Sequence, residues 1–379
     1  MIKKKKLVFL TGTRAEFGKL KPLIRCLNDT DQCEVHLFVT GMHLLEKYGG
    51  TAREVLREFP NVYLYNNQAF GSRMDITLSN TIYGFGYYIS EISPDLIIVH
   101  GDRVETLAGA IVGALNNILV AHIEGGELSG TIDELMRHSV TKLAHIHFVA
   151  NEQAKKRIIQ LGEIEENIII IGSPDIDVMS SEDLPALENV CKHYNIDFDE
   201  HAILLYHPVT SELKKLKRSV KELIDAVIES GLNYVVIYPN NDPGCKILIE
   251  EYSKLDGLPN FKLFPSIQFE SFLVLLKNAK FIIGNSSAGI REAPMYAIPT
   301  INLGSRQHNR FRHDSIFDVK EKGKMILKAI TDISNNSYKF EPCYFFGNGG
   351  SALKFKEALN KKGFWDTKTQ KQFLDLYDI

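Results

Sequence analysis

Short apolar segments alternate with longer amphipathic segments along most of the chain, and this alternation limits the possible fold more than any other feature. Strands that are apolar on both faces are typical of a parallel sheet covered by helices on each side. The pattern therefore predicts an α/β fold. In the first half, the expected strands are 7–10, 35–39, 96–99, 119–123, 146–150 and 168–171, and the expected helices include 19–27, 106–115 and 133–143.

The alternation stops between residues 173 and 201, where prolines and acidic residues are concentrated. It then resumes with expected strands at 202–206, 234–238, 261–264, 281–283 and 300–303. A chain of 379 residues is also long for a single core. We therefore expect two Rossmann-like, doubly wound domains that face a cleft, since ligands bind at the carboxyl ends of parallel strands. The predicted boundaries are 1–175 for the first domain, 176–200 for a linker, 201–365 for the second domain and 366–379 for a C-terminal helix that could cross back to the first domain.

The composition argues against several classes of binding partner and cofactor. The net charge of −3 provides no basic field, so neither nucleic acid nor an anionic membrane is an expected partner. The lysines at 3–6 precede only four apolar residues, too few for a signal peptide, and no apolar run is long enough to span a bilayer. Scattered cysteines without Cys-x-x-Cys spacing predict a cytoplasmic protein. We expect no metal and no cofactor, and a structural role for His138, His145 and His147.

Residues 284–294 indicate a phosphate site. They directly follow the apolar run 281–283 and begin with Gly-Asn-Ser-Ser-Ala-Gly. A helix that opens at Ser286 and Ser287 would present free backbone N–H groups and its positive end to a phosphate. Glu292 would then lie within the first turns, close enough to reach a ribose hydroxyl. An ordinary turn with a serine cap is the alternative.

Three carboxylates are expected to converge on the cleft. Asp102 and Glu124 follow neighbouring predicted strands, and Asp133 begins a predicted helix. Gly125 and Gly126 would let the backbone approach a substrate closely. Crowded carboxyl groups raise one another's pKa, so that one can hold a proton while another acts as a base. For Asp133, a plain helix N-cap is the alternative.

Other candidates for ligand contact lie at strand ends and in loops. Arg14 follows the first strand, where its guanidinium could bind two oxygens of a diphosphate or remain a solvated surface group. His207 could donate to a phosphate, act as an acid or be a satisfied core histidine. Phe272 could stack on a base or belong to the core. Arg306 and Arg310 could close on the phosphates or be ordinary exposed loop arginines, and Arg103, Glu127 and Asn240 are further possible contacts.

Taken together, these motifs resemble one family, the UDP-N-acetylglucosamine 2-epimerases, and specifically the hydrolysing branch used in sialic acid and related nonulosonate biosynthesis. The resemblance extends from about Leu7 to Arg310. The order and spacing of the motifs make it highly specific. They are Gly-Thr-Arg-Ala-Glu-Phe-Gly-Lys at 12–19, Thr-Gly-Met-His at 40–43, His-Gly-Asp-Arg at 100–103, His-Ile-Glu-Gly-Gly-Glu-Leu-Ser-Gly-Thr at 122–131, Gly-Ser-Pro-Asp at 172–175, His-Pro-Val-Thr at 207–210 and Asn-Ser-Ser-Ala-Gly-Ile-Arg-Glu at 285–292.

The resemblance implies a fold like that of the two-domain GT-B glycosyltransferases, with UDP on the second domain and the sugar in the cleft. It implies a UDP-sugar as the partner and a homodimer as the assembly. It places Asp102, Glu124 and Asp133 at the catalytic positions. It places the UDP contacts at Arg14, His207, Phe272, Ser286, Ser287, Gly289 and Glu292.

Departures from the non-hydrolysing relatives favour the hydrolysing branch. Ala15 replaces a proline, residues 208–210 replace an arginine-rich motif, and Glu127 stands where those relatives have an apolar residue. The expected reaction converts UDP-N-acetylglucosamine and water to N-acetylmannosamine and UDP through 2-acetamidoglucal. A UDP-2,4-diacetamido-2,4,6-trideoxyglucose epimerase for legionaminic acid would share every motif. More distant alternatives are a GT-B glycosyltransferase and a non-enzymatic nucleotide-sugar sensor.

Overall fold

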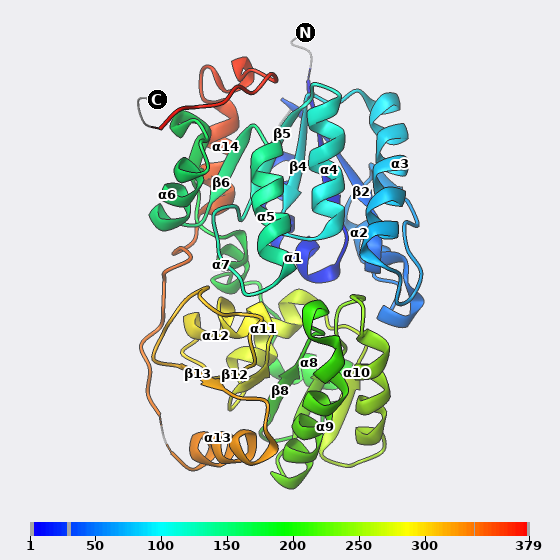
Figure 1. Cartoon of the computed structure of the whole chain (residues 1–379), viewed down its shortest axis with the longest axis vertical. Helices are drawn as coiled ribbons and strands as arrows, with labels where there is room; N and C mark the ends of the chain where they lie inside the picture. Colours follow the sequence, from blue (N-terminus) through cyan, green and yellow to red (C-terminus); the bar gives the residue numbers. More distant parts are fainter. Residues whose placement is uncertain (1–3, 29–31, 337, 377–379) are drawn as a thin grey trace.

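The computed structural model describes residues 4–28, 32–336 and 338–376. Two parallel sheets form two domains that face each other (Figure 1). In the described residues, the first sheet has seven strands in the order β3-β2-β1-β4-β5-β6-β7 and the second has six in the order β10-β9-β8-β11-β12-β13. The prediction of two doubly wound α/β domains is therefore confirmed.

The strands are short and nearly all were predicted. The edge strands β3 and β13 were not, because they are only three and four residues long and partly exposed. The strands are β1 (Lys5–Thr11), β2 (Cys33–Val39), β3 (Val62–Leu64), β4 (Leu96–His100), β5 (Leu119–Ile123), β6 (Ile146–Val149), β7 (Ile168–Ile170), β8 (Ala202–Leu205), β9 (Tyr234–Ile237), β10 (Phe261–Phe264), β11 (Ile282–Gly284), β12 (Thr300–Leu303) and β13 (Ile316–Val319).

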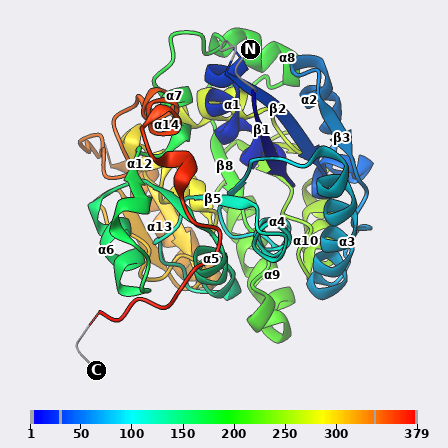
Figure 2. The same ribbon diagram turned by 90° about the horizontal axis from the view of Figure 1, so that it is seen from above.

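Helices cover both faces of each sheet. In the first domain α1 and α14 lie on one face, and α3, α4 and α5 lie on the other (Figure 2). The helices are α1 (Arg14–Asn28), α2 (Ala52–Glu58), α3 (Met74–Ile92), α4 (Val104–Leu115), α5 (Ile132–Leu143), α6 (Glu152–Gln160), α7 (Pro174–Met179), α8 (Leu187–Tyr194), α9 (Leu213–Glu229), α10 (Cys245–Tyr252), α11 (Phe269–Lys277), α12 (Glu292–Met295), α13 (Gly323–Asn335) and α14 (Ser351–Asn360). Across the described ranges, every helix falls short, in length or in apolar content, of what crossing a bilayer requires.

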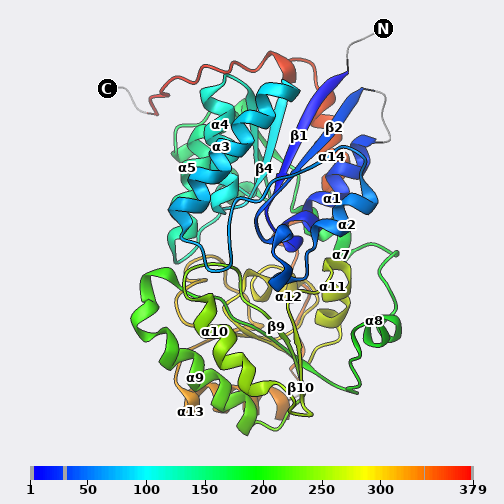
Figure 3. The same ribbon diagram turned by 90° about the vertical axis from the view of Figure 1, so that its right-hand side faces the viewer.

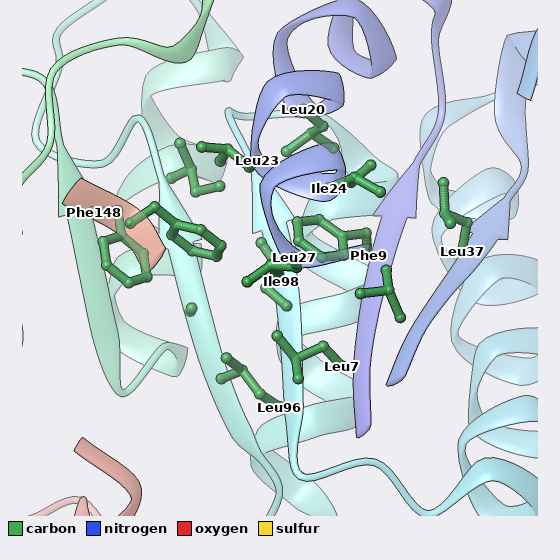
Figure 4. Close-up of a cluster of buried hydrophobic side chains, with 14 of the residues drawn as sticks. Leu7, Phe9, Leu20, Leu23, Ile24, Leu27, Leu37, Leu96, Ile98 and Phe148 are labelled. Atoms are coloured by element: carbon green, nitrogen blue, oxygen red, sulfur yellow. The ribbon is translucent and has the colours of Figure 1, made fainter. Parts of the chain in front are cut away.

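The packing on the two faces of the first sheet explains why its strands are apolar at consecutive positions. Leu7 and Phe9 of β1 pack beneath the apolar face of α1 (Figure 4). Val8 and Leu10, the intervening residues, pack on the opposite face of the sheet with Phe85 of α3. Because alternate side chains point to opposite faces, a strand covered on both sides is apolar at every position.

The C-terminal segment belongs to the first domain from α14 onward, earlier than the predicted crossing at residue 366. Figure 1 shows the chain leaving the second domain and returning to the first. The ring of Phe355 in α14 lies 4.8 Å from that of Phe148 and 6.4 Å from that of Phe9. The predicted helix at 366–379 is wrong over 367–376, which form no helix, and 377–379 lie outside the described residues. Local sequence could not reveal which core α14 covers.

The segment predicted as a linker, 176–200, also contains ordered structure. It includes most of α7 and the whole of α8. Ile176, Met179 and Val190 pack in a core with Leu205 of the second sheet. The segment therefore connects the domains while covering one face of the second sheet.

Candidate active site

The loops after the strands of both sheets face each other (Figure 3). Side chains from both domains line a cavity between them. It brings together most of the predicted site residues, although they come from many separate segments. Those that line it are Arg14, Asp102, Arg103, Glu124, Asp133, His207, Asn240, Phe272, Ser286, Ser287, Glu292 and Arg306. Gly289 and Glu127 lie behind the wall.

The three predicted carboxylates line the first-domain side. Asp102 lies just after β4 and forms an ion pair with the buried Arg137 of α5. Asp133 is the second residue of α5, whose N-cap position is occupied by Thr131, so Asp133 is not the cap. Its Oδ2 accepts a hydrogen bond from Nη2 of Arg306 at 3.0 Å. Asp133 is thus joined across the cavity to the second domain.

Glu124 is held in an unusual backbone conformation. Its φ is +70°, in the left-handed region that side chains with a Cβ rarely adopt. Its Oε1 accepts a hydrogen bond from Nη2 of Arg310 at 2.8 Å, and its Oε2 lies 3.2 Å from Nε2 of His100. Burial acts to raise the pKa of Glu124, but Arg291, Lys19 and His100 outweigh it and hold the pKa well below the usual range. The carboxylate is therefore ionised at neutral pH.

Lys19 lies at the centre of the site. Its Nζ is 3.1 Å from Glu292, 3.2 Å from Asp175 and 4.0 Å from Glu124. Burial acts to lower the pKa of Lys19, but these three carboxylates raise it above the usual value. Sequence reasoning did not identify Lys19 as a site residue, and its place in the motif at 12–19 was the only indication.

Two buried arginines of the second domain complete the network, and sequence reasoning missed one of them as well. Arg291 forms an ion pair with Glu127 and lies 3.5 Å from Oε1 of Glu124. Arg310, predicted as a possible phosphate contact, instead donates 2.8 Å hydrogen bonds to both Glu124 and Glu127. The prediction that Glu127 contacts substrate is corrected, because both of its oxygens are bound to these arginines behind the cavity wall.

Arg14 and Arg103 bridge the two domains at the cavity rim. Arg14 donates to Oε2 of Glu54 at 2.8 Å and to Oγ of Ser266 at 3.0 Å, so it is not a free surface group. Arg103 lies 3.4 Å from Oδ1 of Asp242. Both guanidiniums line the cavity and add positive charge to it.

His207 is oriented by the backbone around it. Its backbone N–H donates to Oδ1 of Asn285 at 2.7 Å, and its Nδ1 accepts from the backbone N–H of Asn240 at 3.1 Å. Burial, then Arg306 and Arg103, hold the pKa of His207 well below its usual value. The ring is therefore neutral, and because Nδ1 accepts, Nε2 carries the proton and can donate.

The predicted helix after β11 is replaced by two shorter elements. A 3₁₀ turn spans Ser287–Gly289, and the four-residue helix α12 begins at Glu292. Ser286 caps the turn by accepting from the backbone N–H of Ala288 at 3.3 Å. Ser286, Ser287 and Glu292 reach the cavity as predicted. A phosphate bound here would therefore meet the backbone N–H groups of one turn, not the positive end of a longer helix.

Gly289 does not contact the cavity and the prediction for it is corrected. A Cβ at this position would lie 2.6 Å from Cγ2 of Thr300, and Oγ1 of Thr300 donates to the Gly289 carbonyl at 2.7 Å. Close packing of the turn on β12 therefore accounts for the glycine. Phe272 of α11, in contrast, lines the cavity while also packing in the core of the second domain.

Two of the three histidines considered for a metal have structural partners. His145 accepts the backbone N–H of Val120 through Nδ1 at 3.0 Å, and Nε2 of His147 lies 3.2 Å from Glu163. Within the described ranges, no group of three or more His, Cys, Asp or Glu side chains is arranged to hold a metal ion.

The chain matches a protein family and several known proteins over most of its length. The profile of the UDP-N-acetylglucosamine 2-epimerase family matches residues 25–360. The UDP-N-acetylglucosamine 2-epimerase of Neisseria meningitidis serogroup B is 47% identical over 98% of this chain and 99% of that protein. The UDP-N,N'-diacetylbacillosamine 2-epimerase (hydrolyzing) of Legionella pneumophila is 33% identical over 94% of this chain and 95% of that protein.

Solved structures show the same fold. The UDP-GlcNAc 2-epimerase of Methanocaldococcus jannaschii, solved in complex with UDP-GlcNAc and UDP, superposes with a TM-score of 0.81 at 24% identity, over 94% of this chain and 99% of that one. The profile matches most of the chain, and the Neisseria and Legionella relatives cover 94% of it or more. The chain therefore belongs to the UDP-N-acetylglucosamine 2-epimerase family.

Proposed function

We propose that the protein is a hydrolysing epimerase that converts UDP-N-acetylglucosamine and water to N-acetylmannosamine and UDP. One observation carries the proposal: Asp102, Glu124 and Asp133 line a single cavity whose opposite wall holds Ser286, Ser287 and Arg306. The carboxylates suit proton transfer on a sugar, and the opposite wall suits an anionic leaving group. The 47% identity to the Neisseria enzyme supports the same substrate.

UDP would bind mainly to the second domain. The turn that begins at Ser286 offers backbone N–H groups to a phosphate, and Nε2 of the neutral His207 offers a further donor. Arg14 would approach the diphosphate from the first domain. The uracil would lie along the apolar wall near Phe272, and Glu292 would accept from a ribose hydroxyl.

The reaction begins at the anomeric carbon. The proton at C2 is not adjacent to a carbonyl, so a carboxylate cannot remove it from the resting substrate at a useful rate. Cleavage of the C1–O bond transfers the electron pair to UDP and leaves an oxocarbenium-like centre, which makes the C2 proton acidic. Stabilisation of the departing diphosphate therefore lowers the barrier for proton removal as well.

Glu124 is suited to remove this proton, because it lines the cavity and is ionised at neutral pH, so that it can accept a proton. Loss of the proton gives 2-acetamidoglucal. A carboxyl group on the other face of the ring then returns a proton to C2 with inverted configuration, while water forms the new C1–O bond and releases one of its protons to the solvent. Asp102 and Asp133 are the two candidates for this acid.

Incubation of the protein with UDP-N-acetylglucosamine alone in D₂O tests the proposal. Proton NMR should show free N-acetylmannosamine with deuterium at C2 and an equal amount of UDP. A glycosyltransferase without an acceptor would release little free sugar, and a sensor would release none. Product without deuterium at C2 would contradict the elimination.

The 33% identity to the Legionella enzyme supports one other substrate, a UDP-diacetamido sugar. Turnover of UDP-N-acetylglucosamine and of UDP-2,4-diacetamido-2,4,6-trideoxyglucose should therefore be compared side by side. We expect kcat/KM to be higher for the first, in line with the greater identity to the Neisseria enzyme. The reverse order would assign the protein to the second substrate.

We also propose a cytoplasmic homodimer. The location rests on the scattered cysteines without Cys-x-x-Cys spacing. The assembly is supported by exposed apolar side chains on α3, where Ile76, Tyr83 and Tyr87 recur at helical spacing. Sedimentation analysis should give twice the chain mass, and Tyr87→Asp should yield a monomer if this surface is the interface. A wild-type monomer would contradict the assembly.

A further inference from the structure

A tight turn aims two carboxylates at the same guanidinium groups. Glu124 has φ of +70° and Gly126 has φ of +75°. A Cβ on Gly126 would lie only 2.3 Å from the carbonyl oxygen of Ala154, so the backbone packs there without space for a side chain. This path folds the chain so that Glu124 and Glu127, three positions apart, reach the same two arginines.

The contacts form a closed bridge. Nη2 of Arg310 lies 2.8 Å from Oε1 of Glu124 and 2.8 Å from Oε2 of Glu127. Nη1 of Arg291 contacts Oε1 of Glu127 and lies 3.5 Å from Oε1 of Glu124. All four side chains are at most 8% exposed. Such pairs are weakly screened by solvent and are sensitive to the loss of one member.

The two carboxylates have different environments. Both oxygens of Glu127 are bound to the arginines, and Glu127 does not line the cavity. Glu124 lines the cavity: its Oε1 is bound by Arg310, whereas its Oε2 lies 3.2 Å from Nε2 of His100 and 4.0 Å from Nζ of Lys19. Its Oε2 has no aligned hydrogen-bond donor among the described residues. Only Glu124 therefore has an oxygen available to a substrate.

The bridge joins the two domains. Both glutamates follow β5 of the first sheet, whereas Arg291 and Arg310 belong to loops of the second domain. Arg291 is fixed further by Ser173 and by the ring of Phe346, whose centroid lies 4.4 Å from its Cζ. The orientation of the Glu124 carboxylate is consequently tied to the relative position of the domains.

We propose that Glu127 is a positioning residue: by binding Arg291 and Arg310 it keeps both guanidiniums on Oε1 of Glu124, so that Oε2, without an arginine partner, can take the substrate proton when the domains are closed. The inference rests on the proposed function and assigns Glu127 no contact with substrate.

Replacing Glu127 with glutamine tests the idea with little change of shape. The amide can accept from one guanidinium only, and its NH₂ group faces the other, donor against donor. Arg291 and Arg310 would then turn to Glu124, occupy Oε2 and stabilise its ionised form, which makes it a poorer base. We expect kcat to fall about 100-fold while KM and the calorimetric Kd for UDP stay within about threefold.

Arg310→Lys provides a second variant in case the first folds poorly. It keeps the charge but loses the fork that binds both glutamates, so kcat should fall about 30-fold with the UDP Kd unchanged. Glu163→Gln is the matched control. Glu163 is a buried carboxylate of the same domain that binds Lys142 at 2.7 Å and lies outside the cavity, so its loss should lower Tm without changing kcat.

The outcomes separate the inference from the proposed function. If wild type releases N-acetylmannosamine and both bridge variants retain kcat within about threefold, the positioning role is wrong. A fall in kcat matched by an equal weakening of UDP binding would also overturn it, since that indicates a merely structural role. If wild type itself releases no amino sugar, the proposed function is wrong and the inference fails with it.

Discussion

The ammonium nitrogen of Lys19 lies 3.1 Å from Oε1 of Glu292, which joins α1 of the first domain to α12 of the second in the floor of the cavity. Both side chains are almost completely buried. The pair is therefore part of the contact between the domains and part of the site. A ligand that binds Glu292 approaches a group whose position depends on domain closure.

Glu292→Ala should mainly weaken UDP binding. The side chain lines the cavity, and its Oε2 has no hydrogen-bond partner among the described residues, so it is available to a ribose hydroxyl. Loss of a hydrogen bond to a charged group should raise the Kd for UDP about 10-fold or more. Calorimetric titration with UDP measures this directly, and unchanged affinity would refute the ribose contact.

Asp102→Asn and Glu124→Gln should each abolish most turnover while UDP still binds. The substitutions preserve shape and hydrogen-bonding capacity at the oxygen that meets Arg137 or Arg310, but remove the charge needed for proton transfer. We expect kcat to fall by roughly 10³-fold or more, with the Kd for UDP near that of wild type. A normal rate in either variant removes that residue from the chemistry.

Glu16 should make stability depend on pH. Burial raises the pKa of Glu16 from 4.5 to about 7, against the lowering effects of His100 and the backbone N–H of Gly12. Because the folded pKa is the higher one, the folded state binds more protons than the unfolded state between these values, and stability falls as pH rises from 4.5 to 7. Relative to Glu16→Gln, the free energy of unfolding of the wild type should decrease by about 3 kcal/mol between pH 4.5 and pH 7.

Urea unfolding of both proteins at several pH values from 4.5 to 8 provides the measurement. The difference in free energy of unfolding between wild type and Glu16→Gln should change through the window and level off towards pH 8. A difference that does not vary with pH would show that Glu16 titrates normally.

Gly18→Ala should push the domains apart. A Cβ on Gly18 of α1 would lie 2.4 Å from Cβ of Phe269, the first residue of α11, which is closer than side chains can pack. A displacement of about 1 Å at the cavity can reduce kcat about 100-fold. Gly86→Ala in α3 is the control, because a Cβ there has no atom within 4 Å among the described residues. Equal kcat in the two variants would show that this close approach does not matter.

Exhaustive treatment with EDTA should leave full activity. The proposed mechanism stabilises the leaving diphosphate with Arg14, Arg306, His207 and the turn at Ser286, so the protein itself supplies the positive charge and hydrogen-bond donors. Rates measured before and after chelation, with and without added Mg²⁺, test this. A strict requirement for Mg²⁺ would mean that these donors are insufficient.

The sequence by itself determined the fold class, most of the strands and the three carboxylates. Strands buried on both faces are apolar throughout, and in parallel sheets the residues that follow them gather at one edge, so Asp102 and Glu124 could be placed together from local pattern alone. The family motifs identified the cavity residues on the second domain in the same way, apart from Gly289, which packs on β12 instead.

Only the tertiary structure decided which charges meet. Nothing local to Lys19 indicates Glu292 as its partner, and nothing near Glu127 indicates Arg291 and Arg310, because each pair joins side chains from different domains. The same holds for α14, whose apolar face would suit either core but packs on Phe9 and Phe148 of the first. Periodicity reports whether a side chain is buried, whereas the group it is buried against depends on how distant segments are brought together.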